Sequence, residues 1–275
     1  MSEHPGDSGS EASNESRLPI DEHVEEGCDA EGRKVRHRGI YLLPNLFTTG
    51  NLFAGFFAIV SAMGDHYVSA AIAIFVAMVL DGLDGRVARL TNTQSAFGAE
   101  YDSLSDMVAF GLAPALLAYQ WALSELGNVG LTVAFIYSAC AALRLARFNT
   151  QIGKVDKKWF VGLASPAAAG VVAGTVWALK DFDVDGADMP VLIVMLYALL
   201  VALVGVLMVS NIKFYSFKDL DFRGRVPFVA MLIVVLVFAV VSTDPPRILL
   251  LIFLAYALSG PIQLLLQLRR REKAA

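Results

Sequence analysis

From Pro44 onward the chain is a succession of long apolar stretches separated by short polar segments. Each stretch runs for roughly 17–25 residues, the length that an α-helix needs to cross about 30 Å of hydrocarbon. The stretches are continuously apolar and too long for the strands of a membrane β-barrel, in which apolar and polar side chains alternate. The pattern therefore predicts transmembrane helices at residues 44–63, 67–88, 99–121, 127–148, 161–179, 190–210, 226–242 and 247–267.

The residues before and after these stretches are polar and charged. Residues 1–32 hold ten acidic residues and one arginine, with few large apolar side chains, so we expect a disordered acidic tail. A basic juxtamembrane segment, 33–43, separates this tail from a transmembrane catalytic domain, 44–267, and a basic segment follows at 268–275. The predicted fold class is an all-α integral membrane protein with about eight transmembrane helices.

Composition agrees with a membrane location. Hydrophobic residues make up 56% of the 275 residues, compared with about 45–50% in a typical soluble domain. If both termini lie on one side of the membrane, that side holds all 22 Lys and Arg residues except Lys180 and Arg247. Positive residues concentrate on the cytoplasmic side. We therefore expect a multi-pass protein of the cell membrane, with both termini and the active site in the cytoplasm.

The distribution of charge also bears on partners. The formal net charge of −4 comes from the acidic tail, and the rest of the chain is net positive. Basic residues at the cytoplasmic lipid surface attract anionic membrane lipids. No basic patch lies free of the membrane, which excludes nucleic acid as a partner.

Two pairs of aspartates stand at the facing ends of neighbouring predicted helices. Asp81 and Asp84 are spaced i, i+3 near the end of the second span, and Asp102 and Asp106 are spaced i, i+4 at the start of the third. Each pair lies on one helix face. Four carboxylates in a small volume of low dielectric repel one another strongly, and hard divalent cations prefer such oxygen ligands. The spacing therefore predicts a site for Mg²⁺ or Mn²⁺. Two ions there would suit phosphoryl transfer, since paired metals stabilise both attacking and leaving oxygens.

A proton relay or a cation transporter would also place carboxylates in the membrane. Such a protein would not need the residues that accompany the aspartates. Gly85 and Gly98 lack side chains where a bulky substrate can approach the backbone, and Arg89 can bind a phosphate through its planar guanidinium. A transporter also needs polar access from both sides, and the non-cytoplasmic halves of the spans are almost uniformly apolar. Transport is therefore the weaker alternative.

The spacing of these residues resembles the signature of the CDP-alcohol phosphotransferases. That signature is Asp-x-x-Asp-Gly-x-x-Ala-Arg, then eight residues, then Gly-x-x-x-Asp-x-x-x-Asp. Its fixed positions in this chain are Asp81, Asp84, Gly85, Ala88, Arg89, Gly98, Asp102 and Asp106. The resemblance implies six core helices around a cavity open to the cytoplasm, to which this chain adds two C-terminal helices.

The resemblance also implies roles for individual residues. Asp81, Asp84 and Asp102 are implied to bind metal, and Asp106 to act as both metal ligand and general base. Contacts to the CDP-linked lipid are implied for Gly85, Arg89, Ser95 and Gly98.

Three further stretches are similar to the membrane-embedded phosphatidylserine synthases of bacteria and archaea. They are residues 43–53, 142–149 and 159–169, and residues 210–218 add to them. The similarity implies CDP-diacylglycerol and L-serine as substrates, and phosphatidylserine and CMP as products, in phospholipid biosynthesis. Glycerol phosphate and inositol phosphate remain alternative acceptors, and a homodimer is left open.

Polar residues outside the signature are candidates for further substrate contacts. Asn45, Thr48 and Asn51 bring hydrogen-bonding groups to the start of the first span, where they can bind the nucleotide of CDP-diacylglycerol, although Asn45 can instead cap the helix. Arg144 and Arg147, spaced i, i+3 at the end of the fourth span, can pair with the aspartates, bind pyrophosphate or bind the carboxylate of serine. Positive-inside anchoring is the alternative for both. The full set of candidates for serine or phosphate is Arg144, Arg147, Lys213 and Lys218.

Overall fold

The structure is a computed structural model of the 275-residue chain. It describes residues 27–28, 34–35, 42–91, 95–151, 159–215 and 228–272. The chain divides into two units, residues 1–40 and 41–275. In the first unit β1 (Gly27–Cys28) pairs antiparallel with β2 (Lys34–Val35). The rest of the predicted acidic tail lies outside the described residues.

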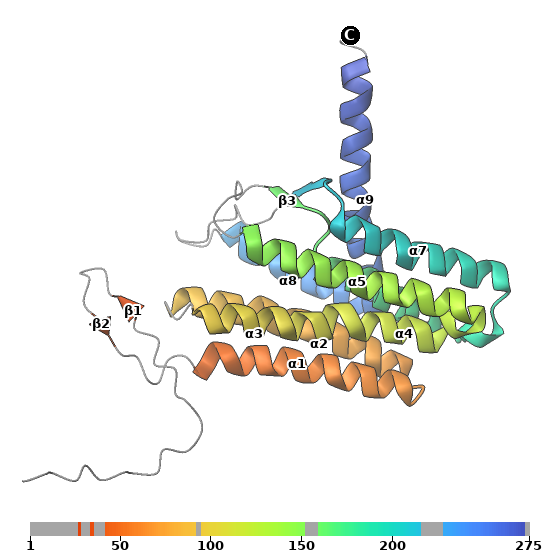
Figure 1. Ribbon diagram of the computed structural model, residues 1–275, viewed down its shortest axis with the longest axis horizontal. Coiled ribbons are helices and arrows are strands. Elements are labelled where there is room, and N and C mark those ends of the chain that lie inside the picture. The colour runs from red at the N-terminus through yellow and green to blue at the C-terminus, as the bar shows by residue number, and fades with distance from the viewer. Residues whose placement is uncertain are drawn as a thin grey trace, which may run out of the picture. The chain divides into compact units, whose positions relative to one another are not determined.

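The second unit is a set of helices (Figure 1). These are α1 (Leu42–Met63), α2 (Tyr67–Leu90), α3 (Ala96–Asp106), α4 (Ala113–Trp121), α5 (Asn128–Gln151), α6 (Ser165–Asp181), α7 (Val191–Val209), α8 (Phe228–Thr243) and α9 (Pro245–Glu272). A π-helical segment, η1 (Met107–Leu112), continues α3 into α4, and short 3-10 turns stand at η2 (Leu123–Leu126) and η3 (Gly186–Asp188). Helix occupies each of the predicted spans, which confirms the all-α membrane fold class.

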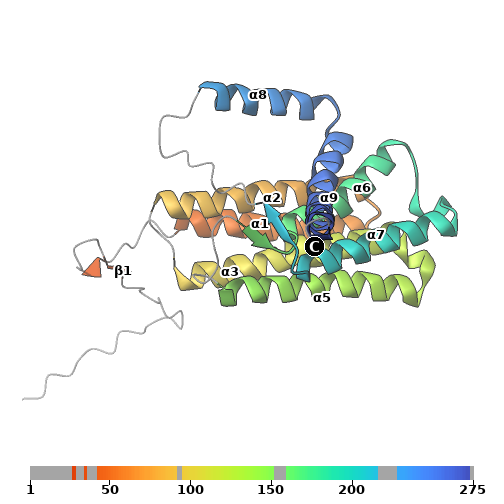
Figure 2. The same cartoon turned by 90° about the horizontal axis from the view of Figure 1, so that it is seen from above.

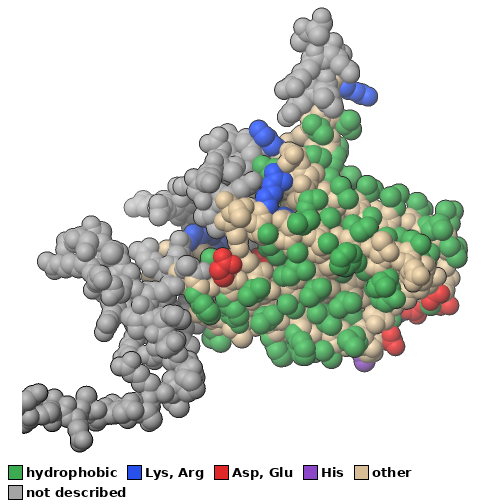
Figure 3. Space-filling model, in the orientation of Figure 1, with side chains coloured by type: hydrophobic (Ala, Val, Ile, Leu, Met, Phe, Trp, Pro, Cys, Tyr) green, Lys and Arg blue, Asp and Glu red, His purple; other side chains and the backbone are tan. Residues whose placement is uncertain are grey.

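The outer surface of the bundle is apolar. Within the described ranges, five helical stretches are both long and apolar enough to cross a membrane: Asn45–Met63, Tyr67–Leu90, Asn128–Thr150, Val191–Val209 and Pro245–Leu266. Large apolar side chains cover the flank of the molecule, with basic side chains towards one end and a group of acidic side chains at the other (Figure 3). An apolar surface of this extent requires lipid around it. The chain is thus a multi-pass membrane protein.

Alanine dominates the interfaces between the helices. Ala58 and Ala62 on α1 and Ala70, Ala71 and Ala77 on α2 are all 0% exposed. Small residues allow membrane helices to approach closely, so that van der Waals packing replaces the hydrophobic effect that operates in water. On α1, Gly55 packs so closely against η1 that an added Cβ would stand 2.7 Å from the Ala109 Cα.

The two C-terminal helices are arranged differently from the rest. In Figure 2 α8 lies apart from the other helices, and in Figure 1 α9 runs across their direction. Gly170 and Gly174 on α6 leave room for Phe253 and Leu250 of α9. The predicted eighth span, 247–267, falls within α9, which continues to Glu272.

A short antiparallel sheet at the start of α6 departs from the helical expectation. In this sheet β3 (Trp159–Val161) pairs with β4 (Lys213–Tyr215), and Phe160 lies opposite Phe214. The expected fifth span therefore does not begin at 161. Gly162 adopts a positive φ of 84°, which glycine accommodates without strain, and α6 begins only at Ser165, with a proline in its first turn.

Candidate active site

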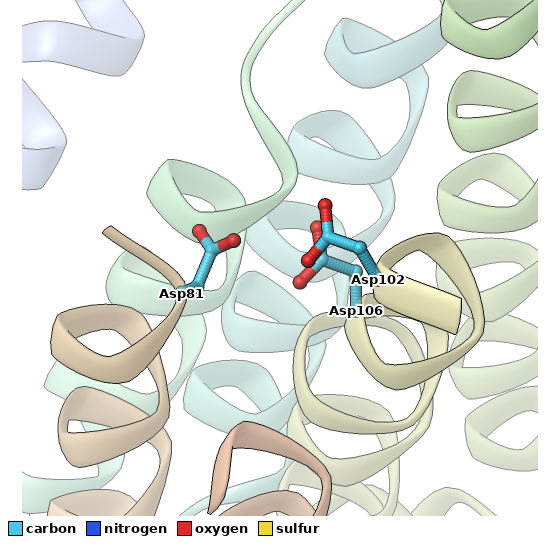
Figure 4. A group of neighbouring side chains, drawn as sticks. All are labelled: Asp81, Asp102 and Asp106. Atoms are coloured by element: carbon cyan, nitrogen blue, oxygen red, sulfur yellow. The ribbon is translucent and has the colours of Figure 1, made fainter. Parts of the chain in front are cut away.

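Three aspartates from two helices converge on one small volume. Each offers one carboxylate oxygen, and the oxygens of Asp81, Asp102 and Asp106 all lie within 4.8 Å of one another. Figure 4 shows Asp81 on α2 facing Asp102 and Asp106, which project side by side from α3. The i, i+4 spacing in α3 places its two carboxylates on one face, so the grouping follows from the sequence once α2 and α3 are neighbours.

The fourth aspartate of the signature lies beside this group rather than in it. Asp84 is 4% exposed, and its Oδ2 accepts a hydrogen bond from Thr48 Oγ1 of α1 at 2.9 Å. It remains near enough to Asp81 and Asp102 to repel both carboxylates. The structure thus brings three of the four predicted metal ligands together, while Asp84 is hydrogen-bonded to Thr48 of α1.

The three grouped carboxylates fit a divalent cation. Asp102 Oδ1 is buried, and none of the residues that the structure describes gives it a hydrogen-bond partner. A buried polar atom without a partner is costly and calls for a ligand. Carboxylate oxygens are the ligands that Mg²⁺ and Mn²⁺ prefer. The residues that would hold such an ion are Asp81, Asp102 and Asp106.

Helix α1 supplies polar side chains to this acidic cluster. Asn51 is 0% exposed, and its Nδ2 donates a hydrogen bond to Asp106 Oδ1 at 3.0 Å. It lies one helical turn from Thr48, which binds Asp84. The sequence grouped Asn51 with Asn45 and Thr48 as side chains that can hydrogen-bond the nucleotide, but its contact with Asp106 was not expected. The signal for it is the i, i+3 recurrence of Asn45, Thr48 and Asn51 along one face of α1.

Gly85, the first glycine of the signature, stands where the backbone is accessible. A Cβ added to Gly85 would meet no heavy atom within 4 Å, so the space beside this part of α2 is open. Arg89 is exposed, and its Nε donates to the carbonyl oxygen of Gly85 at 2.8 Å. That bond holds the guanidinium beside Gly85. Its contact with a substrate phosphate stays a prediction.

The start of α3 is organised by a helix cap. Ser95 is the residue that precedes the helix, and its Oγ accepts a hydrogen bond from the Gly98 amide at 2.9 Å. Such capping stabilises a helix start, so Ser95 has a structural role besides the predicted substrate contact. Asn45 does not cap α1, because it lies inside that helix. A Cβ on Gly98 would stand 3.8 Å from Asn45 Oδ1, so the Asn45 side chain faces the α3 start.

Of the four candidates for serine or phosphate, Arg144 lies at the cluster. Its guanidinium donates to Ser165 Oγ at the start of α6, and it lies within electrostatic reach of Asp81 and Asp106. Ser165, which is 0% exposed, was not expected from the sequence. Arg144 therefore places one cation beside the converging carboxylates.

The other three candidates are placed differently. Arg147 donates to Asn211 Oδ1 at 2.8 Å and to the carbonyl oxygen of Val209 at 3.3 Å, so it ties α5 to the end of α7. Lys213 is exposed on β4. Lys218 lies outside the described residues.

Comparison with known proteins identifies the family. Residues 41–259 match the family described as CDP-alcohol phosphatidyltransferase. The chain belongs to this family. The prediction from the aspartate signature is confirmed, and the cation-transport alternative has no support. The matched region includes the aspartate-bearing helices α2 and α3 and most of α9.

Several relatives within this family carry the same name, CDP-diacylglycerol–serine O-phosphatidyltransferase. The relative from Helicobacter pylori is 39% identical over 200 residues, which cover 72% of this chain and 82% of the relative. The relative from Methanocaldococcus jannaschii is 33% identical over 226 residues, 82% of this chain and 96% of its own length. The relative from Bacillus subtilis is 38% identical over 176 residues, 64% of this chain and 91% of its own.

Proposed function

We propose that this enzyme transfers a phosphatidyl group from CDP-diacylglycerol to L-serine, giving phosphatidylserine and CMP in phospholipid biosynthesis. The observation that carries the proposal is the convergence of Asp81, Asp102 and Asp106, whose oxygens lie within 4.8 Å, on the two helices of the family signature. Serine as the acceptor is supported by the names of relatives that match across most of the chain.

The reaction needs a nucleophile, a proton acceptor and stabilisation of the leaving group. The serine hydroxyl oxygen attacks the phosphorus that carries diacylglycerol, and the bond from this phosphorus to the CMP oxygen breaks with its electron pair leaving on CMP. Asp106 accepts the hydroxyl proton. One or two Mg²⁺ or Mn²⁺ ions held by the aspartates would supply positive charge to the pyrophosphate. Positioning and electrostatics provide most of the rate enhancement in transfers of this kind.

The surrounding residues divide between the two substrates. The open space beside Gly85 and the guanidinium of Arg89 suit the CDP portion of the lipid substrate. We assign Asn45 of α1, whose side chain faces the start of α3, to the same portion. Among the described residues, Arg144 is a cation with electrostatic contacts to both Asp81 and Asp106, and we assign it to the serine carboxylate. Arginine suits this task because its guanidinium forms paired hydrogen bonds with a carboxylate. Arg147 is assigned to anchoring, given its bonds to the end of α7.

We place the active site and both termini on the cytoplasmic side. The aspartates lie on the same side of the predicted topology as all the lysines and arginines except Lys180 and Arg247, and positive residues favour the cytoplasm. Serine then enters from water, the acyl chains stay in lipid, and basic residues hold anionic headgroups at the same surface.

An assay on the purified protein tests the proposal. The protein in lipid nanodiscs is given CDP-diacylglycerol with labelled serine, glycerol phosphate or inositol phosphate, and CMP and labelled lipid are measured. We expect both products with serine, loss of both on chelation, and recovery with Mg²⁺ or Mn²⁺. Labelled lipid from another alcohol alone would overturn the acceptor. Undiminished turnover after removal of metal would overturn the metal site.

A further inference from the structure

Asn51 combines three properties that the reaction described above does not use. It is 0% exposed, its Nδ2 donates to Asp106 Oδ1 at 3.0 Å, and its own Oδ1 is buried without a hydrogen-bond partner among the residues that the structure describes. A buried amide oxygen left unpaired costs roughly 1–3 kcal/mol. An unpaired buried group of this kind in a native protein calls for a functional explanation.

The contacts of α1 fix where this amide lies. One turn before Asn51, Thr48 donates to Asp84 of α2 at 2.9 Å. One turn after it, Gly55 meets η1 so closely that an added Cβ would stand 2.7 Å from the Ala109 Cα. The helix is therefore held against α2 before Asn51 and, after it, against η1, which directly continues the aspartate-bearing α3. The amide cannot turn away from Asp106 without losing its only described hydrogen bond.

We propose that Asn51 is a positioning residue for Asp106, and that its unpaired amide oxygen accepts a hydrogen bond from a donor group of the acceptor alcohol. The proposal rests on the function proposed above. The N–H of Asn51 occupies Asp106 Oδ1 and fixes the rotation of the carboxylate, so that Oδ2 is directed to the reacting hydroxyl. An amide oxygen only accepts hydrogen bonds. Its partner must therefore be an O–H or N–H group, and the hydroxyl and ammonium groups of serine provide both.

Two substitutions separate the two halves of this role. Asn51→Leu has nearly the same shape and removes both the donor and the acceptor. Asn51→Asp keeps acceptor oxygens in place and removes the donor. The readouts are kcat and KM for serine, KM for CDP-diacylglycerol, and Mn²⁺ affinity by electron paramagnetic resonance.

For Asn51→Leu we expect kcat to fall by about 10–100-fold, the effect of losing one hydrogen bond to a charged group. The KM for serine should rise, while the KM for CDP-diacylglycerol and the Mn²⁺ affinity should stay close to those of the wild type. For Asn51→Asp we expect a similar fall in kcat with a smaller rise in the KM for serine. A residue that only supports the fold would instead lower the amount of folded protein and leave these constants unchanged in the folded fraction.

Asn149→Leu is the matched control. Asn149 also bridges two helices through its amide, because its Nδ2 donates to Ser103 Oγ on α3 at 3.0 Å, but its amide bonds to that hydroxyl and not to an aspartate. We expect wild-type constants from it. A loss of Mn²⁺ affinity in Asn51→Leu as large as that in Asp81→Asn would make Asn51 a metal ligand and overturn the proposal. Unchanged kcat and KM in Asn51→Leu would overturn it as well.

The design keeps this inference separate from the acceptor assignment. The wild-type protein is first assayed with the panel of alcohols, and the Asn51 variants are then measured with whichever alcohol it uses. If serine fails in the wild type, the proposed function fails alone. If the wild type works and Asn51→Leu equals it, the inference fails alone.

Discussion

At the scale of single residues, the aspartates of the signature differ in their hydrogen bonds. Asp106 accepts a hydrogen bond from Asn51, Asp84 accepts one from Thr48, and Asp102 has one buried oxygen without a hydrogen-bond partner among the described residues. Hydrogen bonds orient a carboxylate, whereas a free buried oxygen suits a cation. We therefore expect substitutions at these positions to differ in effect, although the side chains are chemically identical.

Asp106→Asn should retain binding of CDP-diacylglycerol, because the other aspartates and the residues near Gly85 remain. Its turnover should fall by about 10²–10⁴-fold, the usual contribution of a positioned general base, and the residual rate should rise with pH as hydroxide replaces the carboxylate. Asp81→Asn should instead lose metal and nucleotide affinity together. Calorimetric binding of CDP-diacylglycerol and Mn²⁺, with CMP release across pH, distinguishes the two variants. Near-normal turnover in Asp106→Asn would show that the base is elsewhere.

Thr48→Val should weaken catalysis through Asp84. Valine has almost the same shape as threonine but cannot donate the 2.9 Å hydrogen bond to Asp84 Oδ2. Loss of a hydrogen bond to a charged group corresponds to roughly 1.5–3 kcal/mol, so we expect kcat/KM to fall by about 10–100-fold. Thr48→Ser keeps the hydroxyl and serves as the control in the same CMP-release assay. If the two variants have equal activity, the bond to Asp84 has no part in catalysis.

At the scale of the helices, α1 is the element that joins the two acidic segments. It bonds to α2 through Thr48 and to α3 through Asn51, and Gly55 lets it approach η1 closely. The added Cβ at Gly55 would meet backbone, which cannot move aside cheaply. The position of Asp106, the proposed general base, therefore depends in part on a glycine that lies outside the signature.

Gly55→Ala should lower the free energy of unfolding by about 1–3 kcal/mol, the usual cost of overpacking. Gly50→Ala on the same helix is the control, since its Cβ would stand 3.3 Å from Leu80 Cδ1, the far end of a flexible side chain. Replacing glycine with alanine raises helix propensity equally in both variants. The difference between their free energies of unfolding therefore measures the clash between the added Cβ and Ala109. Unfolding in mixed detergent measures both. Equal stability would show that α1 and η1 separate without cost.

The sequence predicted the helices well because their signal is local. Span length and apolar composition depend only on consecutive residues, and i, i+3 and i, i+4 spacing places Asp81 and Asp84, and Asp102 and Asp106, on shared faces. The signature also identified the family. The contacts between side chains of different helices were not predicted, because they depend on how the helices are rotated against one another. Asp84 accepts a hydrogen bond from Thr48 of α1, a contact that no spacing within α2 can reveal.

Other features depend on contacts between distant parts of the chain. Arg144 bonds to Ser165 across 21 residues, and β3 pairs with β4 across more than 50. The π-helical segment η1 looks like ordinary apolar helix in the sequence, but Tyr137 donates to the carbonyl oxygen of Phe110 within it at 3.1 Å. Side-chain donors of this kind satisfy carbonyl groups where helix geometry changes. None of these pairings leaves a periodic trace in the sequence.

At the scale of the whole molecule, positive charge is concentrated towards one end of the membrane unit. Figure 3 shows basic side chains towards one end and a group of acidic side chains at the other. The only positive residues placed on the acidic side by the topology, Lys180 and Arg247, are paired there with aspartates: Lys180 with Asp185, and Arg247 with Asp181 and Asp244. Because aspartates neutralise both residues, they do not argue against the orientation that the other lysines and arginines predict. That orientation can be tested by chemical labelling.

Single cysteines on the two sides should report opposite accessibility. The native Cys28 and Cys140 are first replaced by serine, and then Glu100→Cys at the start of α3 or Glu125→Cys in η2 is introduced. Both glutamates are exposed, so the two probes differ mainly in their side of the membrane. A membrane-impermeant maleimide should label Glu125→Cys in intact spheroplasts and Glu100→Cys only after permeabilisation. Because Glu100 lies two residues before Asp102, labelling of Glu100→Cys in intact spheroplasts would put the carboxylates outside the cell. Serine and CDP-diacylglycerol would then have to reach them from the other side of the membrane.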